Sequence, residues 1–234
     1  MKHIRSALCL TLLTLLTACA SAENKDPIED VNRNIFAFNA VVDKTIIEPI
    51  ARGYRYVMPK QGRVAVRNFF RNLGEPVNLA NAALQGDGEQ ALTSFWRFTL
   101  NTTFGLAGFH DFAGENTPLK YRSEDFGQTL AVWMGNDNSA YFVIPILGPS
   151  TTRDTVGRVV DLFLNPWYYA LETEESIALG VTDALTRREQ VLDLTEEIEE
   201  TSFDPYATYR SIYLQNRAKQ IKNRTPSNQE FVDQ

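Results

Sequence analysis

The chain has 234 residues, with 23 lysines and arginines against 29 aspartates and glutamates, for a formal net charge of -6. This acidic balance, without a basic stripe, argues against a nucleic-acid-binding protein. The length suits one large domain or two small ones, and the two cysteines are Cys9 and Cys19.

Residues 1–18 have the zones of an export signal, with basic residues at Lys2 and Arg5, an apolar run over 7–16 and small residues before Cys19. A signal that ends on cysteine resembles that of bacterial lipoproteins, in which the thiol is acylated and the preceding peptide is removed. We therefore predict a lipid anchor at Cys19 and a tether over 19–25, with an ordinary secretory signal as the alternative. Three acyl chains exceed what stable membrane anchoring needs. Alanine rather than aspartate at position 20 favours the outer membrane.

Removal of the signal would leave 234 minus 18, or 216, residues and a charge of 21 minus 29, or -8. With Cys9 removed and Cys19 acylated, no disulfide is expected. No uninterrupted apolar stretch near 18 residues follows Cys19, so we expect contact with the bilayer through amphipathic surfaces rather than a spanning helix.

The first helix is predicted to start at Asp26-Pro27-Ile28-Glu29, with Asp26 as the capping residue and Pro27 in the first turn. Apolar residues then recur at steps of three and four, which predicts one apolar stripe. The stripe consists of Ile28, Val31, Ile35, Phe38, Val42 and Ile46.

Polar residues border that stripe at Asn32, Asn39 and Asp43. They have two interpretations. Such groups could make ordinary hydrogen bonds between helices, or they could form part of a polar lining beside lipid.

Short helices are predicted over the next hundred residues, separated by glycine and proline. Their ranges are 49–59, 64–73, 76–84, 91–100 and 125–133, with an irregular stretch around Gly105, Gly108 and Gly114. The run 141–147 has the composition of a strand, but Pro145 lacks a backbone donor, which predicts an edge or a buried extended segment.

The last third is predicted to be helical as well. The box from Thr151 to Asp154 predicts a helix that ends before Asn165-Pro166. Helices resume near Glu174, where four glutamates over 196–200 indicate a solvated face. A final helix starts at Asp204-Pro205, and the tail over 225–234 is predicted to be disordered. No linker separates two domains, so a single mainly helical domain over 26–224 is expected.

Several blocks, in order along nearly the whole chain, resemble the MlaA family, also called VacJ. They are Asp26-Pro27, Asn32-Arg33, Phe38-Asn39, Asn68-Phe69, Asn72-Leu73, Glu75-Pro76, Leu84-Gln85-Gly86, Arg97-Phe98, Asn101-Thr102-Thr103, Gly105, residues 125–130, residues 145–154 and Asp204-Pro205-Tyr206.

The resemblance implies an all-α ring-like domain of short amphipathic helices in the outer membrane, with an extended or hairpin segment near 133–147. It also implies a function: removing misplaced phospholipids from the outer leaflet and passing them to a soluble periplasmic carrier (MlaC-like), in association with a trimeric porin. Neither a cofactor nor nucleic acid is implied. A non-transporting envelope scaffold is the alternative.

The chain departs from the family in the glycine-rich hairpin beside the channel. Here residues 133–141 keep only Gly135, followed by Asn136, Asp137 and Asn138. Asparagine and aspartate can still form a turn. The segment is either a gate or a plain surface turn.

A hydrolase acting on lipid or cell wall is a second rival. A serine nucleophile needs a histidine base, and His110 is the only histidine after the signal. No G-x-S-x-G elbow occurs. One histidine and no free thiol also argue against a zinc site, and the carboxylate spacing matches no calcium loop. We therefore expect no catalytic or metal site.

Overall fold

The computed structural model describes residues 25–135 and 139–222. Over these residues the chain is mainly helical, as predicted, with one small sheet. The elements are α2 (Glu29–Val42), η1 (Asp43–Ile47), α3 (Glu48–Val57), α4 (Lys60–Leu84), α5 (Gly88–Thr103), α6 (Phe112–Asn116), α7 (Phe126–Met134), β1 (Tyr141–Ile144), β2 (Gly148–Thr151), α8 (Thr152–Leu164), α9 (Trp167–Ala170), α10 (Thr173–Gln190), α11 (Leu192–Thr201) and α12 (Pro205–Lys222).

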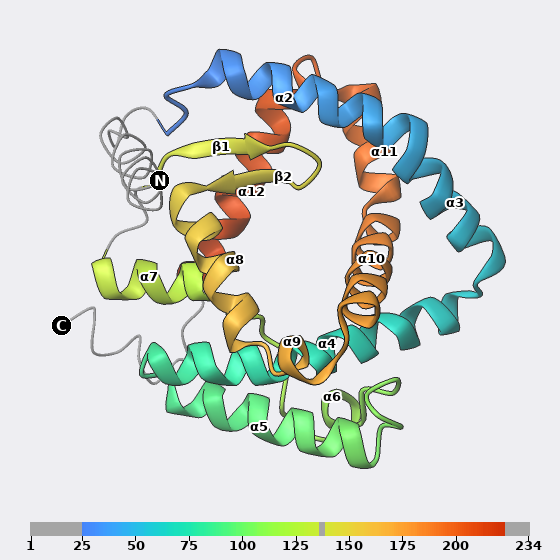
Figure 1. The fold of residues 1–234 in the computed structure, drawn as a ribbon, viewed down its shortest axis with the longest axis vertical. Helices are drawn as coiled ribbons and strands as arrows, with labels where there is room; N and C mark the ends of the chain where they lie inside the picture. Colours follow the sequence, from blue (N-terminus) through green and yellow to red (C-terminus); the bar gives the residue numbers. More distant parts are fainter. Residues whose placement is uncertain (1–24, 136–138, 223–234) are drawn as a thin grey trace, which may run out of the picture.

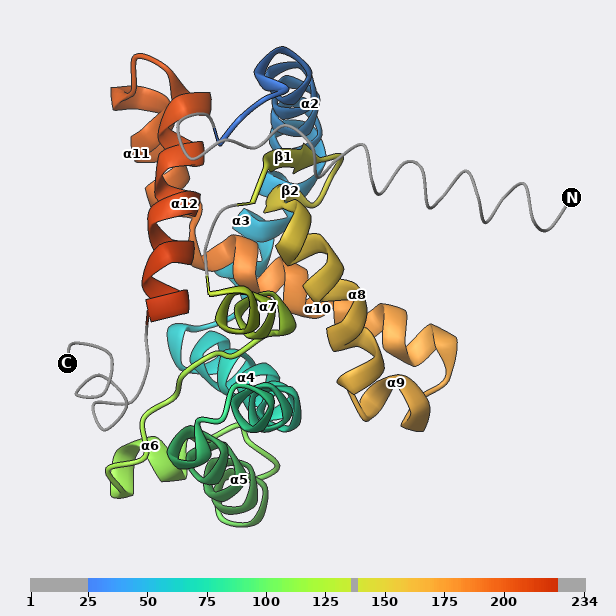
Figure 2. The same cartoon turned by 90° about the vertical axis from the view of Figure 1, so that its left-hand side faces the viewer.

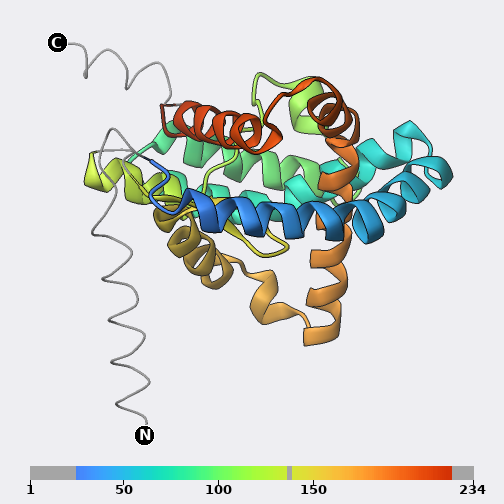
Figure 3. The same cartoon turned by 90° about the horizontal axis from the view of Figure 1, so that it is seen from above.

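The elements follow one another around a ring (Figure 1). One arc is formed by α2, η1 and α3, the next by the helical hairpin of α4 and α5, and the return by α7, α8 and the β1–β2 hairpin. The two sides of the ring differ, because α9 and the start of α10 project on one side and α12 lies on the other (Figures 2 and 3). Among the described residues, no helix combines the length and hydropathy that crossing a bilayer requires.

The start of the first helix differs from the prediction. Ile28 occupies the cap position without a side-chain hydrogen bond, and the helix begins at Glu29. The carboxylate of Asp26 is buried instead, where it accepts hydrogen bonds from Asn32, Tyr206 and Arg210. A capping bond joins the charged carboxylate to one neutral N–H group, whereas here the carboxylate accepts from three side chains, one of them a charged arginine, so these tertiary partners displace the local one.

Two prolines lie within continuous helical structure, although the sequence predicts helix boundaries at both. Pro49 follows the widened turn of η1, in which the backbone already departs from the regular pattern, and helical structure continues from Glu29 to Val57. Pro76 lies inside α4, so the predicted helices 64–73 and 76–84 are one. Proline lacks the N–H that would complete the helical bond there, while the neighbouring Glu75 is bonded to Arg97 of α5.

The strand prediction over 141–147 is confirmed for Tyr141–Ile144, which pairs antiparallel with an unpredicted strand, β2. Tyr141 lies opposite Thr151 and Ile144 lies opposite Gly148. Tyr141 and Val143 form a small apolar core with Tyr206 of α12. The hairpin therefore joins the first and the last helices of the ring.

The predicted helix starts at Thr151 and Asp204 are confirmed, since their side chains accept the backbone N–H groups of Asp154 and Ala207. The structure adds a cap at Asp125, which accepts the N–H of Gln128 at the start of α7. The short helices α6 and α9 were not predicted, and α6 lies in the stretch that was expected to be irregular.

Candidate functional site: an exposed apolar surface around a polar interior

Polarity is inverted in this fold relative to a water-soluble protein. Among the described residues, 10 apolar side chains are buried against 21 polar or charged ones, while 30 large apolar side chains are exposed. Charged residues are rarely fully buried in soluble proteins, and large exposed apolar patches mark interaction surfaces. The arrangement suits a molecule whose outer surroundings are partly apolar.

Four of the six residues of the predicted apolar stripe belong to this exposed set, while Ile35 and Val42 are half-buried and Ile35 packs against the small core. Val31 is 53% exposed, Phe38 53% and Ile46 57%, while the buried side of α2 holds Asn32. The same holds on α5, where Phe95 and Trp96 are exposed while Ser94, Arg97 and Asn101 are buried. Exposed apolar residues elsewhere include Leu106, Phe109, Trp133, Met134, Val156, Val159, Leu162, Phe163, Tyr168, Tyr169, Ile177 and Val181.

A buried ion pair holds α4 and α5 together. Arg97, 1% exposed, donates to Glu75 at 2.7 Å, to Asp111 at 2.9 Å and to the carbonyl of Leu119 at 2.9 Å. Burial raises the pKa of Glu75, although Arg97 opposes this effect. Such a pair is well compensated only while every partner remains in place.

A second buried network connects α12 to α7 and α8. Arg217 donates to Asp125 at 2.6 Å and to Asp154 at 2.9 Å, and Tyr213 donates to Asp154 at 2.7 Å. Burial opposes ionisation of Asp154, but the hydrogen bond and charge of Arg217 outweigh it and lower the pKa to about 2. The C-terminal helix is thereby fastened to the ring by charged bonds.

The polar residues singled out on the first helix contact two different parts of the structure. Asn32 and Asn39 bond to the hairpin: Asn32 accepts from the N–H of Val143 at 2.9 Å, and Asn39 donates to the carbonyl of Ile144 at 2.9 Å. Asp43, in η1, instead pairs with Arg188 of α10 at 2.7 Å. The structure therefore brings Asn32 and Asn39 together at the hairpin and places Asp43 beside α10.

The loop of the hairpin is strained and apolar. Ile146 has φ of 66°, a conformation that β-branched residues rarely adopt, and its N–H donates to Asn39 at 2.7 Å. Ile146 is 63% exposed and Leu147 68% exposed. Figure 1 shows this loop reaching toward the middle of the ring. One bond from α2 thus helps to hold an apolar tip in a costly conformation.

Gly135 ends α7 in a left-handed conformation, with φ of 65°. The predicted turn residues Asn136, Asp137 and Asn138 lie outside the described residues, as do the predicted anchor Cys19 and the predicted tail 225–234.

His110 is half exposed and lies 3.6 Å from Glu115. Ser150 is fully buried and bonds to Thr155 at 2.8 Å. The described residues contain no group of three or more histidine, cysteine, aspartate or glutamate side chains arranged to hold a metal.

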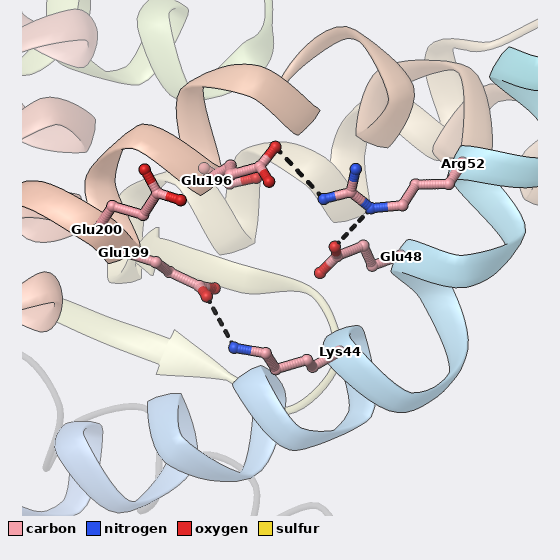
Figure 4. Close-up of a pocket in the computed structure, with 7 residues that line it drawn as sticks. Lys44, Glu48, Arg52, Glu196, Glu199 and Glu200 are labelled. Carbon is pink, nitrogen blue, oxygen red and sulfur yellow. Dashed lines mark hydrogen bonds and ion pairs between the residues drawn. The ribbon is translucent and has the colours of Figure 1, made fainter.

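A polar pocket of about 340 Å³ lies where η1 and α3 face α11 (Figure 4). Its lining consists of Lys44, Glu48, Arg52, Thr195, Glu196, Glu199 and Glu200. Lys44 pairs with Glu199 at 3.0 Å, and Arg52 pairs with Glu48 at 2.7 Å and with Glu196 at 3.4 Å. Such a lining suits water or polar groups rather than acyl chains. The glutamates lie on an exposed face, as predicted.

Sequence reasoning missed the two buried ion networks. Several members lie inside the family blocks, among them Glu75, Arg97, Asp125 and Asp154. Their spacing in the sequence does not indicate which carboxylate pairs with which arginine. A basic residue in an otherwise apolar helical stretch, as at Arg97, was the available signal.

The comparisons with known proteins agree over most of the chain. The family model described as MlaA lipoprotein matches residues 24–220. The "Intermembrane phospholipid transport system lipoprotein MlaA" of Escherichia coli (strain K12) is 37% identical over 223 residues, covering 92% of this chain and 87% of the relative. The protein of that name from Haemophilus influenzae is 34% identical over 211 residues, covering 86% of this chain and 84% of the relative.

A solved structure described as "Structural basis for maintenance of bacterial outer membrane lipid asymmetry" superposes with a TM-score of 0.74 at 34% sequence identity. The match covers 84% of this chain and 98% of the solved one. Family model, relatives and fold all agree, and the chain belongs to the MlaA lipoprotein family.

Proposed function

We propose that this chain removes misplaced phospholipids from the outer leaflet of the outer membrane and passes them to a soluble periplasmic carrier. The observation that carries the proposal is the inverted polarity of the ring, with apolar side chains outside and hydrogen-bonded polar groups inside. The names of the relatives, which describe intermembrane phospholipid transport, support it.

The physical requirement for such a protein is cover for the acyl chains. A phospholipid with about 30 methylenes would cost roughly 24 kcal/mol to expose to water, at about 0.8 kcal/mol each. The headgroup needs polar partners along the same path. The exposed apolar side chains of this chain can cover acyl chains, and the accessible pocket between η1, α3 and α11, lined by charged side chains, can accept polar groups.

The membrane attachment proposed here is acylation of Cys19, which would hold the ring at the periplasmic side of the outer membrane. Exposed aromatic and aliphatic side chains on α2, α5 and α8 would then contact lipid or a trimeric porin. Three acyl chains on Cys19 would exceed what stable membrane anchoring needs.

The hairpin is the candidate gate. Asn32 and Asn39 would set its position, Asp43 would fix the adjoining helix, and Gly135 with Asn136, Asp137 and Asn138 would set the turn that precedes it. The strained loop at Ile146, held partly by Asn39, supports a movable role for this element.

Deletion of the chromosomal copy tests the transport function. We expect more phospholipid in the outer leaflet of the deletion strain, measured by labelling lipid on intact cells, and a return to the parental level when the wild-type chain is supplied. An unchanged outer leaflet would contradict transport. Altered porin or carrier assembly with normal lipid would favour a scaffold instead.

Two complementing variants separate the parts of the proposal. Cys19→Ser should leave the chain unanchored and the lipid defect uncorrected, with the protein recovered in the periplasmic fraction. Replacement of residues 136–138 by a rigid proline-containing linker should leave the chain anchored but alter lipid traffic. Normal traffic with that linker would make the segment an ordinary turn.

A further inference from the structure

The first half of α4 is strongly basic. Residues 60–74 contain Lys60, Arg63, Arg67 and Arg71 and no aspartate or glutamate, in a chain whose net charge is -6. Because the three arginines are four residues apart, they lie along one face of the helix, with about 6 Å of rise between neighbours. This face concentrates positive charge within an acidic protein.

Two of these arginines form no ion pair with the described residues. Arg63 pairs with Glu189 of α10 at 2.5 Å. Arg67 and Arg71, by contrast, form no ion pair and no hydrogen bond with any residue that the structure describes, and the Nε of Arg67 is buried without an acceptor. The Nε atoms of the ion-paired Arg63 and Arg217 also lack acceptors, so what distinguishes Arg67 and Arg71 is that no carboxylate pairs with their guanidinium groups. A donor without an acceptor is costly, and an anion that reached these two groups would supply the missing hydrogen bonds.

Arg71 is held in place by an aromatic ring. Its guanidinium lies 4.8 Å from the centre of the Tyr121 ring. Burial, followed by the neighbouring charge of Arg67, lowers the pKa of Arg71, and the charges of Tyr121 and Asp111 oppose this effect only in part. Arg97 also contacts the Tyr121 ring, at 5.5 Å, but Glu75 and Asp111 already balance its charge.

Apolar side chains border the basic face. Val64 and Phe70 are half-buried and lie three residues to either side of Arg67, so they are its neighbours on the helix. The ring of Phe69, next to Phe70, stacks at 4.8 Å on the exposed ring of Phe109. The charged face therefore meets an apolar surface, which suits an amphipathic anion better than a free one.

We infer that Arg67 and Arg71 bind the phosphate group of a phospholipid whose acyl chains lie along the adjoining apolar side chains. Two guanidinium groups one turn apart can both donate to the oxygens of one phosphate. Tyr121 belongs to the segment 117–125, which runs past α4 on the side of the ring where α12 lies (Figure 2). The two arginines thus form a binding site for a lipid headgroup on that side of the ring, and this inference rests on the proposed function.

Binding by the purified full chain in non-ionic detergent micelles tests the inference. Micelles would be titrated with phosphatidylethanolamine, with diacylglycerol of the same acyl chains, or with inorganic phosphate alone, and binding would be followed by native mass spectrometry. The wild-type chain should prefer the phospholipid. Arg67→Gln with Arg71→Gln should weaken phospholipid binding roughly tenfold or more, because charged hydrogen bonds are lost.

A control with the same change of charge is Arg158→Gln with Lys219→Gln, two cationic side chains on α8 and α12 outside the basic face. This control should bind phospholipid as the wild type does. The variants Arg67→Lys and Arg71→Lys should bind with intermediate affinity, because charge is kept and the paired geometry is lost. Without ligand, the double glutamine variant should melt no lower than the wild type, which separates a binding role from a structural one.

Equal binding by the wild type and the double glutamine variant would overturn the inference and leave the proposed function intact. Inorganic phosphate binding as tightly as the phospholipid would assign the arginines to free phosphate instead. Equal binding of diacylglycerol and phospholipid would exclude phosphate recognition. A wild-type chain that bound no phospholipid at all would contradict the proposed function itself.

Discussion

At the scale of single residues, neighbouring carboxylates neutralise the buried arginines of this protein. Arg97 contacts Glu75 and Asp111, and Arg217 contacts Asp125 and Asp154. Each arginine has fixed directions in which it can donate, so the carboxylates must come from defined places on neighbouring helices. These pairs orient the helices at points where few large apolar side chains are buried.

The ion pair of Asp154 makes the free energy of unfolding depend on pH. Its pKa falls from an ordinary 3.8 to about 2 in the folded chain. A depressed pKa contributes stability above about pH 4, and this contribution is lost as the pH falls toward 2. The shift corresponds to about 2 kcal/mol. We expect Asp154→Asn to lower the free energy of unfolding at pH 5 by about that amount, with a smaller difference from wild type at pH 2.5.

Urea unfolding in detergent at both pH values would measure this difference. Asp30→Asn, at an exposed carboxylate on α2, is the matched control and should change stability little at either pH. A difference between wild type and Asp154→Asn that did not shrink on acidification would contradict the linkage.

At the scale of elements, close packing of α7 against α8 depends on two glycines. A Cβ at Gly157 would lie 2.3 Å from the backbone nitrogen of Gly127 and 2.7 Å from its Cα. Because those atoms belong to a helix backbone, they cannot move aside without moving α7. The spacing of the two helices therefore allows no side chain at this position.

Gly157→Ala should therefore destabilise the protein, by about 1–3 kcal/mol or more. Gly180→Ala in α10 is its matched control, since no atom lies within 4 Å of the added Cβ. That substitution should stabilise by roughly 0.5–1 kcal/mol, because alanine is the better helix former. Thermal unfolding of the two variants side by side gives the comparison, and equal or reversed melting temperatures would contradict the contact.

The prolines show the limit of prediction for elements. Pro59 and Pro166 stand at helix boundaries as the sequence indicates, whereas Pro49 and Pro76 lie within helical structure. Local rules assign a cost to each proline but cannot weigh that cost against tertiary bonds. The bond between Glu75 and Arg97, beside Pro76, is one such tertiary bond.

At the scale of the whole molecule, the inverted polarity supports the proposal that lipid rather than water covers part of the outer surface. Trp96 on α5 is 49% exposed. Trp167, in contrast, is half-buried and donates to the carbonyl of Leu73 at 2.9 Å. These two indoles can report on what covers the ring.

Variants that keep a single tryptophan can be placed in bilayers containing brominated phospholipid, whose acyl-chain bromine quenches indole fluorescence on contact. We expect strong quenching when Trp96 is the one kept and weaker quenching when Trp167 is kept. Unbrominated lipid of the same composition gives the reference intensity. Equal quenching of the two, or none for Trp96, would contradict lipid contact at α5.

The sequence by itself determined the helical class, the helix starts at Thr151 and Asp204 and the strand at Tyr141, because these depend on neighbours within a few residues. It also determined the family, because ordered blocks extend along the chain. The tertiary structure alone decided that the stripe of Val31, Phe38 and Ile46 faces outward, since periodicity shows that a helix has two faces but not which is buried. It also decided the pairings of Arg97 and Arg217 and left Arg67 and Arg71 without acidic partners among the described residues, because these relations join residues far apart in the chain.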